Sequence, residues 1–160
     1  MPPDALSSVP SNKEHDVIRQ VKVTLAALGL LLLACGGGAK TNVKVSEAEW
    51  KMAPEVVQTK PGKVAFNVTN DGTEPHEFIV IRSDLPVYGL PIVDDKVNED
   101  AVDIVGQVEP FDPGHAATVT ANLTPGRYLL ICNVKEGGVG ATPLVSHYQK
   151  GMRIAFTVAQ

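Results

Sequence analysis

The sequence has few cysteines, few aromatic residues and no apolar run long enough to cross a membrane. Only two of the 160 residues are cysteine, and Phe, Trp and Tyr together make up 5% of the chain. The most apolar run, VTLAALGLLLLA at residues 23–34, has twelve residues, whereas a spanning helix needs roughly 20. A chain of this length buries a core without disulfides, so one domain of ordinary size is expected.

Charge of one sign is not concentrated in any part of the chain. There are 14 basic and 18 acidic residues, which gives a formal net charge of −4 and no long basic run. A nucleic-acid-binding protein would carry a basic patch, so that class is not expected. Long stretches of helix-forming residues are missing too, whereas 14 Gly and 12 Pro residues mark frequent turns. This balance favours an all-β domain.

Residues 1–35 are predicted to be a leader rather than part of the fold. Arg19 and Lys22 precede the apolar run, whose length is typical of the hydrophobic region of a secretory signal. The segment before residue 17 does not resemble the start of such a signal, which suggests that translation begins at Val17 or Val21.

The apolar run ends in LLAC, which resembles the lipobox of bacterial lipoproteins, with Leu32 and Ala34 at the expected positions before Cys35. The resemblance implies that Cys35 is lipidated after cleavage. Residues 36–42 would then be a flexible tether to the extracytoplasmic face of a bacterial membrane. An uncleaved anchor helix or a plain secretory signal would also export the domain.

Residues 43–160 show short strand patterns separated by turns. GKVAFNVTN places Val64, Phe66 and Val68 on one face and stops at the turn signal NDG. HEFIVIRS is apolar on both faces, as in a strand that is covered on both sides. Six to eight such strands predict a Greek-key β-sandwich. Residues 84–110 are acidic and interrupted by Pro, and we expect a long excursion there with one short helix near residues 99–105.

Four side chains with metal-binding chemistry lie at the ends of these strands. Because Cys35 belongs to the leader, Cys132 is the single cysteine of an exported domain, and an unpaired thiol in an oxidising compartment needs a reason. It joins His76, His147 and Met152 in a soft, mixed donor set. Copper that cycles between Cu(I) and Cu(II) prefers two His and one Cys in a plane with a weak axial Met. Zinc prefers four Cys or His ligands, or three and a water.

The same residues resemble those of the cupredoxins, the type 1 blue copper family. The resemblance rests on NDGTEPHEF, GRYLLIC and SHYQKGM, with VAFNVTN and TPGRY in the expected order, and it covers roughly residues 43–160. It implies one type 1 copper with His76, Cys132 and His147 as equatorial ligands and Met152 as the axial ligand. Electron transfer without catalytic turnover is the implied function, with a redox partner protein and a monomeric state. Glu77 and Asn133 would lie just behind the ligands.

Two features depart from this family. Many members have Asn after the first histidine, where this chain has Glu77. Cys132 and His147 are separated by fourteen residues, where members usually have two to four, so about ten residues within 135–146 are inserted. Closing the longer loop costs about 1 kcal/mol, which is small against metal binding free energies on the order of 10 kcal/mol. Copper binding is therefore still expected.

Three other hypotheses stay open at this point. A copper carrier or store that delivers metal to an exported oxidase or reductase would use the same ligands. A β-sandwich without metal would be a binding module. An enzyme would use Cys132 as nucleophile and His147 as base, but neither a helix N-terminus nor an orienting acid is evident near the thiol to lower its pKa.

Overall fold

The computed structural model describes residues 40–136 and 144–160. The predicted leader, Cys35 and residues 36–39 of the predicted tether lie outside the described residues. Ordered structure begins earlier than predicted, because Thr41 and Asn42 already pair with Val64 and Ala65 in a sheet. Among the described residues, strand pairing thus begins at residue 41, two positions before the predicted start of the domain.

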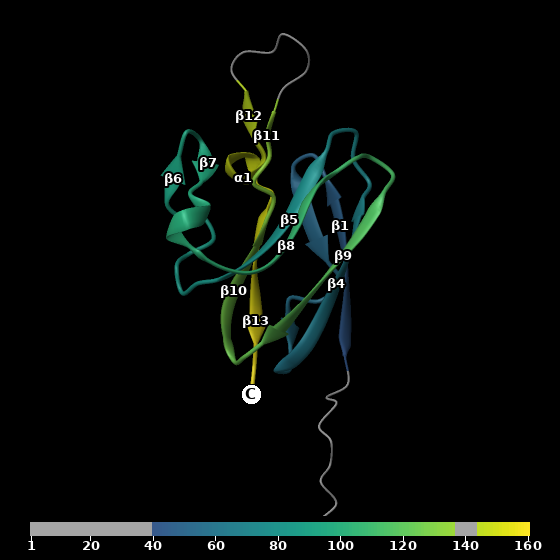
Figure 1. Ribbon diagram of the computed structural model, residues 1–160, viewed down its shortest axis with the longest axis vertical. Coiled ribbons are helices and arrows are strands. Elements are labelled where there is room, and N and C mark those ends of the chain that lie inside the picture. Colours follow the sequence, from purple (N-terminus) through teal and green to yellow (C-terminus); the bar gives the residue numbers. More distant parts are fainter. Residues whose placement is uncertain (1–39, 137–143) are drawn as a thin grey trace, which may run out of the picture. The chain divides into compact units, whose positions relative to one another are not determined.

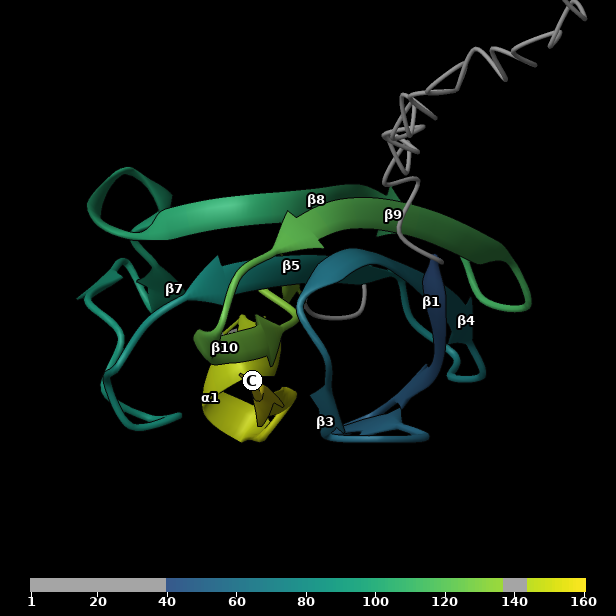
Figure 2. The ribbon, with the colours of Figure 1, turned by 90° about the horizontal axis from the view of Figure 1, so that it is seen from below.

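Two sheets make a sandwich (Figures 1 and 2). The first sheet has four strands in the order β2-β1-β4-β9, in which β1 runs parallel to β4. The second has five strands in the order β3-β13-β10-β5-β8, in which β3 runs parallel to β13. The strands of the first sheet are β1 (Thr41–Ala48), β2 (Lys51–Pro54), β4 (Gly62–Asn70) and β9 (Ala116–Leu123). Those of the second are β3 (Gln58–Thr59), β5 (His76–Arg82), β8 (Asp103–Phe111), β10 (Gly126–Ile131) and β13 (Arg153–Val158).

The main core lies between the two sheets. Val64, Phe66 and Val68 of β4 are fully buried on one face, as their alternation predicted. The Phe66 ring packs against Phe78 of β5 and Phe156 of β13, with ring centroids 5.4 and 5.3 Å apart. These contacts join the first sheet to β5 and β13 of the second, which confirms the all-β sandwich.

A second apolar cluster covers the outer face of the five-stranded sheet. Ile79 and Ile81 of β5 pack there with Leu129 and Ile131 of β10, so β5 is buried on both faces as predicted. The covering segment is the excursion after β5, in which Leu90 and Val97 contribute apolar side chains. The excursion contains the hairpin of β6 (Ile92–Val93) and β7 (Lys96–Val97) and the 3₁₀ turn η1 (Glu99–Ala101), and Figure 1 shows it beside α1 (His147–Lys150).

The prediction for residues 84–110 was wrong at its C-terminal end. The helix expected over residues 99–105 is a single 3₁₀ turn, and Asp103–Phe111 form strand β8. This strand lies at the sheet edge, where most of its side chains are half-buried and the alternation is weak. Gly106 also weakens the strand pattern of this segment. A Cβ at position 106 would lie 3.0 Å from Val119 Cγ2, so the Val119 side chain on β9 would have to shift slightly to accept one.

Seven strands in the described part of the chain have six or more residues, in agreement with the six to eight that were predicted. The remaining strands have two to four residues each. Among the same residues, no helix is both long and apolar enough to cross a membrane.

Candidate metal centre

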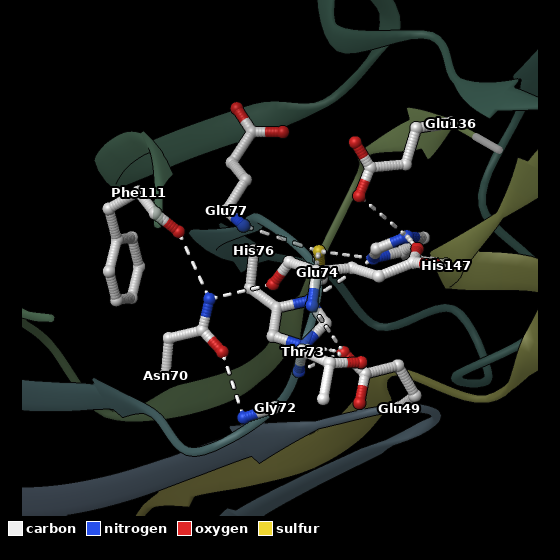
Figure 3. Close-up of polar contacts among 11 residues, drawn as sticks. Glu49, Asn70, Gly72, Thr73, Glu74, His76, Glu77, Phe111, Glu136 and His147 are labelled. Carbon is white, nitrogen blue, oxygen red and sulfur yellow. Dashed lines mark hydrogen bonds and ion pairs between the residues drawn. The ribbon is translucent and has the colours of Figure 1, made fainter. Parts of the chain in front are cut away.

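Asn70 fixes the loop that delivers His76 to one end of the sandwich. The Asn70 side chain is 1% exposed and uses both of its polar ends. Its Nδ2 donates to the carbonyls of Glu74 and Phe111 over 2.8 and 3.0 Å, and its Oδ1 accepts from the N–H of Gly72 over 3.0 Å (Figure 3). Because a fully bonded buried amide has one stable arrangement, the start of β5 is held in place.

The Glu49 carboxylate braces the same loop from the turn between β1 and β2. Its Oε1 accepts from the N–H groups of Thr73 and Glu74, each over 2.8 Å. These two bonds lower the pKa of Glu49 against the opposing effect of partial burial, which is the largest single influence on it. Glu49 is therefore an anion next to His76.

Backbone hydrogen bonds hold the second part of the site, the ligand loop between β10 and β13. The Cys132 N–H donates to the Met152 carbonyl over 3.0 Å, and the Met152 N–H donates to the His147 carbonyl over 3.0 Å. The His147 N–H donates to the Val134 carbonyl over 2.9 Å. Cys132, His147 and Met152 are thus linked through the main chain at the same end of the sheet.

Two short antiparallel strands close the base of the loop formed by the fourteen residues between Cys132 and His147. Strand β11 (Lys135–Glu136) pairs with β12 (Val145–Ser146), so that Lys135 lies opposite Ser146. The Ser146 hydroxyl accepts from the N–H of Gln149 and caps α1, whose first residue is His147. The glycine-rich part of the predicted insert, residues 137–143, lies outside the described residues.

The structure brings three of the four predicted ligands together. His76 Nδ1 lies 3.1 Å from His147 Nδ1, and Cys132 Sγ lies 3.4 Å from His147 Nδ1 and 4.0 Å from His76 Nδ1. All three residues have 0% exposure. Each offers one donor atom within 4.8 Å of the others, which is a compact N₂S set.

Met152 is placed by its backbone and its burial. It directly follows the turn after α1, has 0% exposure and belongs to the same apolar cluster as Cys132. Its role as an axial ligand stays a prediction.

The two residues predicted to lie behind the ligands have different roles. The N–H of Glu77 donates to Cys132 Sγ over 3.3 Å, while its carboxylate accepts from Gln107 Nε2 over 2.8 Å. Asn133 is 1% exposed and holds the excursion: its Oδ1 accepts from the Val97 N–H over 2.7 Å and its Nδ2 donates to Glu99 over 2.7 Å. Glu77 therefore contacts the thiol through its main chain, whereas the Asn133 side chain bonds to the excursion.

Burial sets the protonation of the three donors. It lowers the pKa of His76, and together with the neighbouring His76 it lowers the pKa of His147 to about 4. Burial, with an added contribution from the Glu47 carboxylate, raises the pKa of Cys132 to about 12. At neutral pH both imidazoles are neutral and carry a free lone pair for a metal, whereas the thiol keeps its proton. A protonated buried thiol is a poor nucleophile, which argues against the enzyme hypothesis.

Sequence reasoning missed a buried carboxyl below the site. Glu47 is 0% exposed and both of its oxygens lack a hydrogen-bond partner among the described residues. Burial, reinforced by Glu77, raises its pKa to about 9, so it is neutral at pH 7. The alternation of β1 contained the signal, because Val43, Val45 and Glu47 share its inward face.

Three further carboxylates near the histidines were missed as well. Glu49, Glu74 and Glu136 lie in a turn, a loop and a two-residue strand, where no sequence periodicity links them. His76 Nε2 lies 3.4 Å from Glu49, and His147 Nε2 lies 3.7 Å from both Glu74 and Glu136.

Comparison with known proteins identifies the fold of this chain, whereas no family model matches it. No protein-family model matches the chain, and no curated protein matches it. Among solved structures, reduced auracyanin from the photosynthetic bacterium Roseiflexus castenholzii is similar, with a TM-score of 0.53 and 20% identity over 77% of this chain and 100% of that one. The chain has the cupredoxin fold. Azurin Az-iso2 from the methylotroph Methylomonas sp. strain J is also similar, with a TM-score of 0.50 and 13% identity over 76% of this chain and 100% of that one.

The cupredoxin fold accounts for where the candidate ligands lie. Auracyanin and azurin are both cupredoxins, and the sandwich described above is the fold that the sequence resemblance implied. At 20% and 13% identity the likeness concerns the fold. The chemistry has to be argued from the residues of this chain.

Proposed function

We propose that this domain is a blue copper electron-transfer protein with one type 1 copper. The observation that carries the proposal is the convergence of His76, Cys132 and His147, all fully buried, at one end of a cupredoxin fold. Solved structures with the same fold include auracyanin and azurin, which are blue copper proteins.

The residues present fit copper. A type 1 copper is bound by two imidazole nitrogens, one thiolate sulfur and a weak thioether. His76, His147 and Cys132 would hold it, with the buried Met152 of the same cluster as the thioether. The two Nδ1 atoms and the Cys132 sulfur lie within 4.8 Å of one another and belong to fully buried side chains, so a single ion could be held by all three. When bound, copper supplies a Cu(I)/Cu(II) couple that takes up and releases one electron.

The protein positions the candidate ligands, keeps water away from them and donates one hydrogen bond to the sulfur. The main chain fixes the ligand loop, and Asn70 fixes the loop before His76. The complete burial of the three donors excludes water from them. The Glu77 N–H points at the sulfur and stabilises negative charge there, so the Cys132 thiol gives up its proton to the solvent when the metal binds.

We further propose that the domain is exported and lipid-anchored through Cys35, and that it exchanges electrons with a partner protein at the membrane face. The support is the sequence alone: an apolar run preceded by Arg19 and Lys22 and followed by LLAC. Mass spectrometry of the membrane-bound protein tests the anchor, because a diacylated Cys35 at the mature N-terminus is expected.

The visible absorption spectrum of the purified protein after one equivalent of Cu(II) tests the copper site. An intense thiolate-to-copper band is expected, and Cys132→Ser should abolish it while the protein stays folded by circular dichroism. A wild-type protein that binds Cu(II) without this band would show that the thiolate is not a ligand. Slow Cu(I) exchange with a competing chelator is expected of an electron carrier, whereas fast exchange would favour a copper carrier.

A further inference from the structure

The outward nitrogen of each candidate histidine ligand faces a carboxylate. Figure 3 shows Glu49, Glu74 and Glu136 around His76 and His147. Glu49 comes from the turn after β1, Glu74 from the loop before β5, and Glu136 from β11 at the base of the long loop. Three separate segments thus place an oxygen atom within 3.4–3.7 Å of an imidazole nitrogen.

Three glutamates gather at this end of the domain without a basic side chain paired to them among the described residues. In the part of the chain that the structure describes, the side-chain nitrogen atoms that lie 3.4–3.7 Å from the three glutamates belong to the neutral rings of His76 and His147, and no ion pair with Lys or Arg is formed. The two histidine side chains are 0% exposed, while the side chains of the three glutamates are 21%, 36% and 29% exposed. The carboxylates therefore stay hydrated on one side and face buried imidazoles on the other.

The three carboxylates favour the histidine tautomer that carries its proton on Nε2. A neutral imidazole carries one proton, on either Nδ1 or Nε2. With the two Nδ1 atoms 3.1 Å apart, one neutral ring has to donate from Nδ1 to the other, which leaves its own Nε2 lone pair facing a carboxylate. When both Nδ1 atoms are ligands instead, both rings carry their proton on Nε2. Glu49 then faces the N–H of His76 at 3.4 Å, and Glu74 and Glu136 share the N–H of His147 at 3.7 Å, instead of facing lone pairs.

We propose that Glu49, Glu74 and Glu136 form a carboxylate clamp that accepts the Nε2 protons of the two histidine ligands and stabilises Cu(II) over Cu(I). The inference rests on the proposed function. Glu49 positions the His76 ring, and Glu74 with Glu136 position the His147 ring. The negative charge of Glu49, whose pKa is lowered, also favours the metal state with the higher positive charge, whereas burial and the neighbouring Glu74 raise the pKa of Glu136. The clamp thereby lowers the reduction potential of the site.

The insert acquires a specific role from this arrangement. Glu136 belongs to β11, so the residue that covers His147 Nε2 comes from the segment in which this chain exceeds the usual spacing. The His147 side chain is 0% exposed. The clamp therefore assigns a chemical function to one described residue of the predicted insertion.

Glutamine substitutions test the clamp, because they remove the charge and keep the side-chain shape. Glu49→Gln and the double variant with Glu74→Gln and Glu136→Gln are compared with Glu109→Gln, at an exposed position on β8. This control changes the net charge as much as Glu49→Gln does and half as much as the double variant does. Removing such partners typically costs 10–100-fold in metal affinity. We expect Cu(II) affinity to fall at least tenfold more than Cu(I) affinity, which raises the reduction potential by about 59 mV or more. Glu109→Gln should change it much less.

A second readout examines the proton directly. In the Zn(II)-loaded wild-type protein, nitrogen NMR should show both histidines with Nε2–H and slow exchange with solvent, and the clamp variants should exchange faster. Potentials and exchange rates equal to those of Glu109→Gln would overturn the clamp while leaving the copper site intact. A second Zn(II) per chain that is lost in Glu74→Gln would also overturn it, because the carboxylates would then hold a cation. A wild-type protein that binds neither copper nor zinc would contradict the proposed function and, with it, the carboxylate clamp.

Discussion

The backbone N–H of Glu77 donates to the sulfur of Cys132 over 3.3 Å, while the Glu77 side chain bonds to Gln107 on the neighbouring strand β8. The contact that reaches the thiol is thus independent of the side chain at position 77. This explains how a glutamate can stand where the resemblance led us to expect asparagine.

Glu77→Gln should leave the visible band of the copper-loaded protein at its wild-type wavelength and intensity. The substitution keeps the main-chain N–H and an oxygen that accepts from Gln107. Absorption spectra of the two proteins at equal copper loading check this. A shifted or weakened band would mean that the carboxylate itself acts on the sulfur.

Met152→Leu should change the reduction potential and leave the fold intact. Leucine has a similar volume, so the stability cost of the buried substitution is expected to stay below about 1.5 kcal/mol. Because an axial thioether tunes the potential of a type 1 site, its removal should shift the potential while the blue band persists. Voltammetry gives the answer: an unchanged potential would place Met152 in the core alone.

Metal binding should release one proton per chain between about pH 7 and pH 11, where His76, whose pKa is lowered from 6.5, is neutral. The thiol of Cys132 has a pKa raised to about 12 and is protonated across this range, whereas His147, with a pKa lowered to about 4, is already neutral. Apparent affinity should therefore rise tenfold per pH unit. Below pH 4 a second proton from His147 adds to the release. Zn(II) titration in weak buffer with a pH indicator measures the count, and Cys132→Ser should reduce it to near zero.

Glu47→Gln should flatten the pH dependence of stability in the metal-free protein. The pKa of Glu47 is about 9 in the folded chain, against an ordinary value of 4.5, so the folded state holds a proton that the unfolded state loses. Stability then falls as the pH rises from about 4.5 to 9, and the loss from this group reaches about 3 kcal/mol by pH 7. Urea unfolding at pH 5 and pH 8 compares the two proteins, with Glu109→Gln as the exposed control. If the free energy of unfolding changed equally between pH 5 and pH 8 in wild type and Glu47→Gln, Glu47 would not be a buried neutral acid.

Much of the fold could be predicted because its strands alternate clearly. The inward face of β4 and the two covered faces of β5 follow from their apolar patterns, and His76 and Cys132 stand at the ends of such strands. The gathering of His76, Cys132 and His147 was expected from family resemblance. Local sequence alone shows only that each lies near a strand end.

What could not be predicted depends on contacts between distant segments. Strand β8 has weak alternation because it lies at an edge, so its pairing with β5 is a tertiary effect. The carboxylates of Glu49, Glu74 and Glu136 converge only after three unrelated loops have folded. The two hydrogen bonds between Asn133 and Val97 likewise join residues 36 positions apart in the sequence.

The pairing of Lys135 with Ser146 has a consequence for how such a protein changes over time. Because β11 and β12 meet at the foot of the loop, the sequence distance between Cys132 and His147 is uncoupled from their separation in space, which is 3.4 Å between Sγ and Nδ1. The described foot of the loop therefore sets the distance between the two candidate ligands, so we expect Cys132 and His147 to keep their separation in space in variants that differ in loop length.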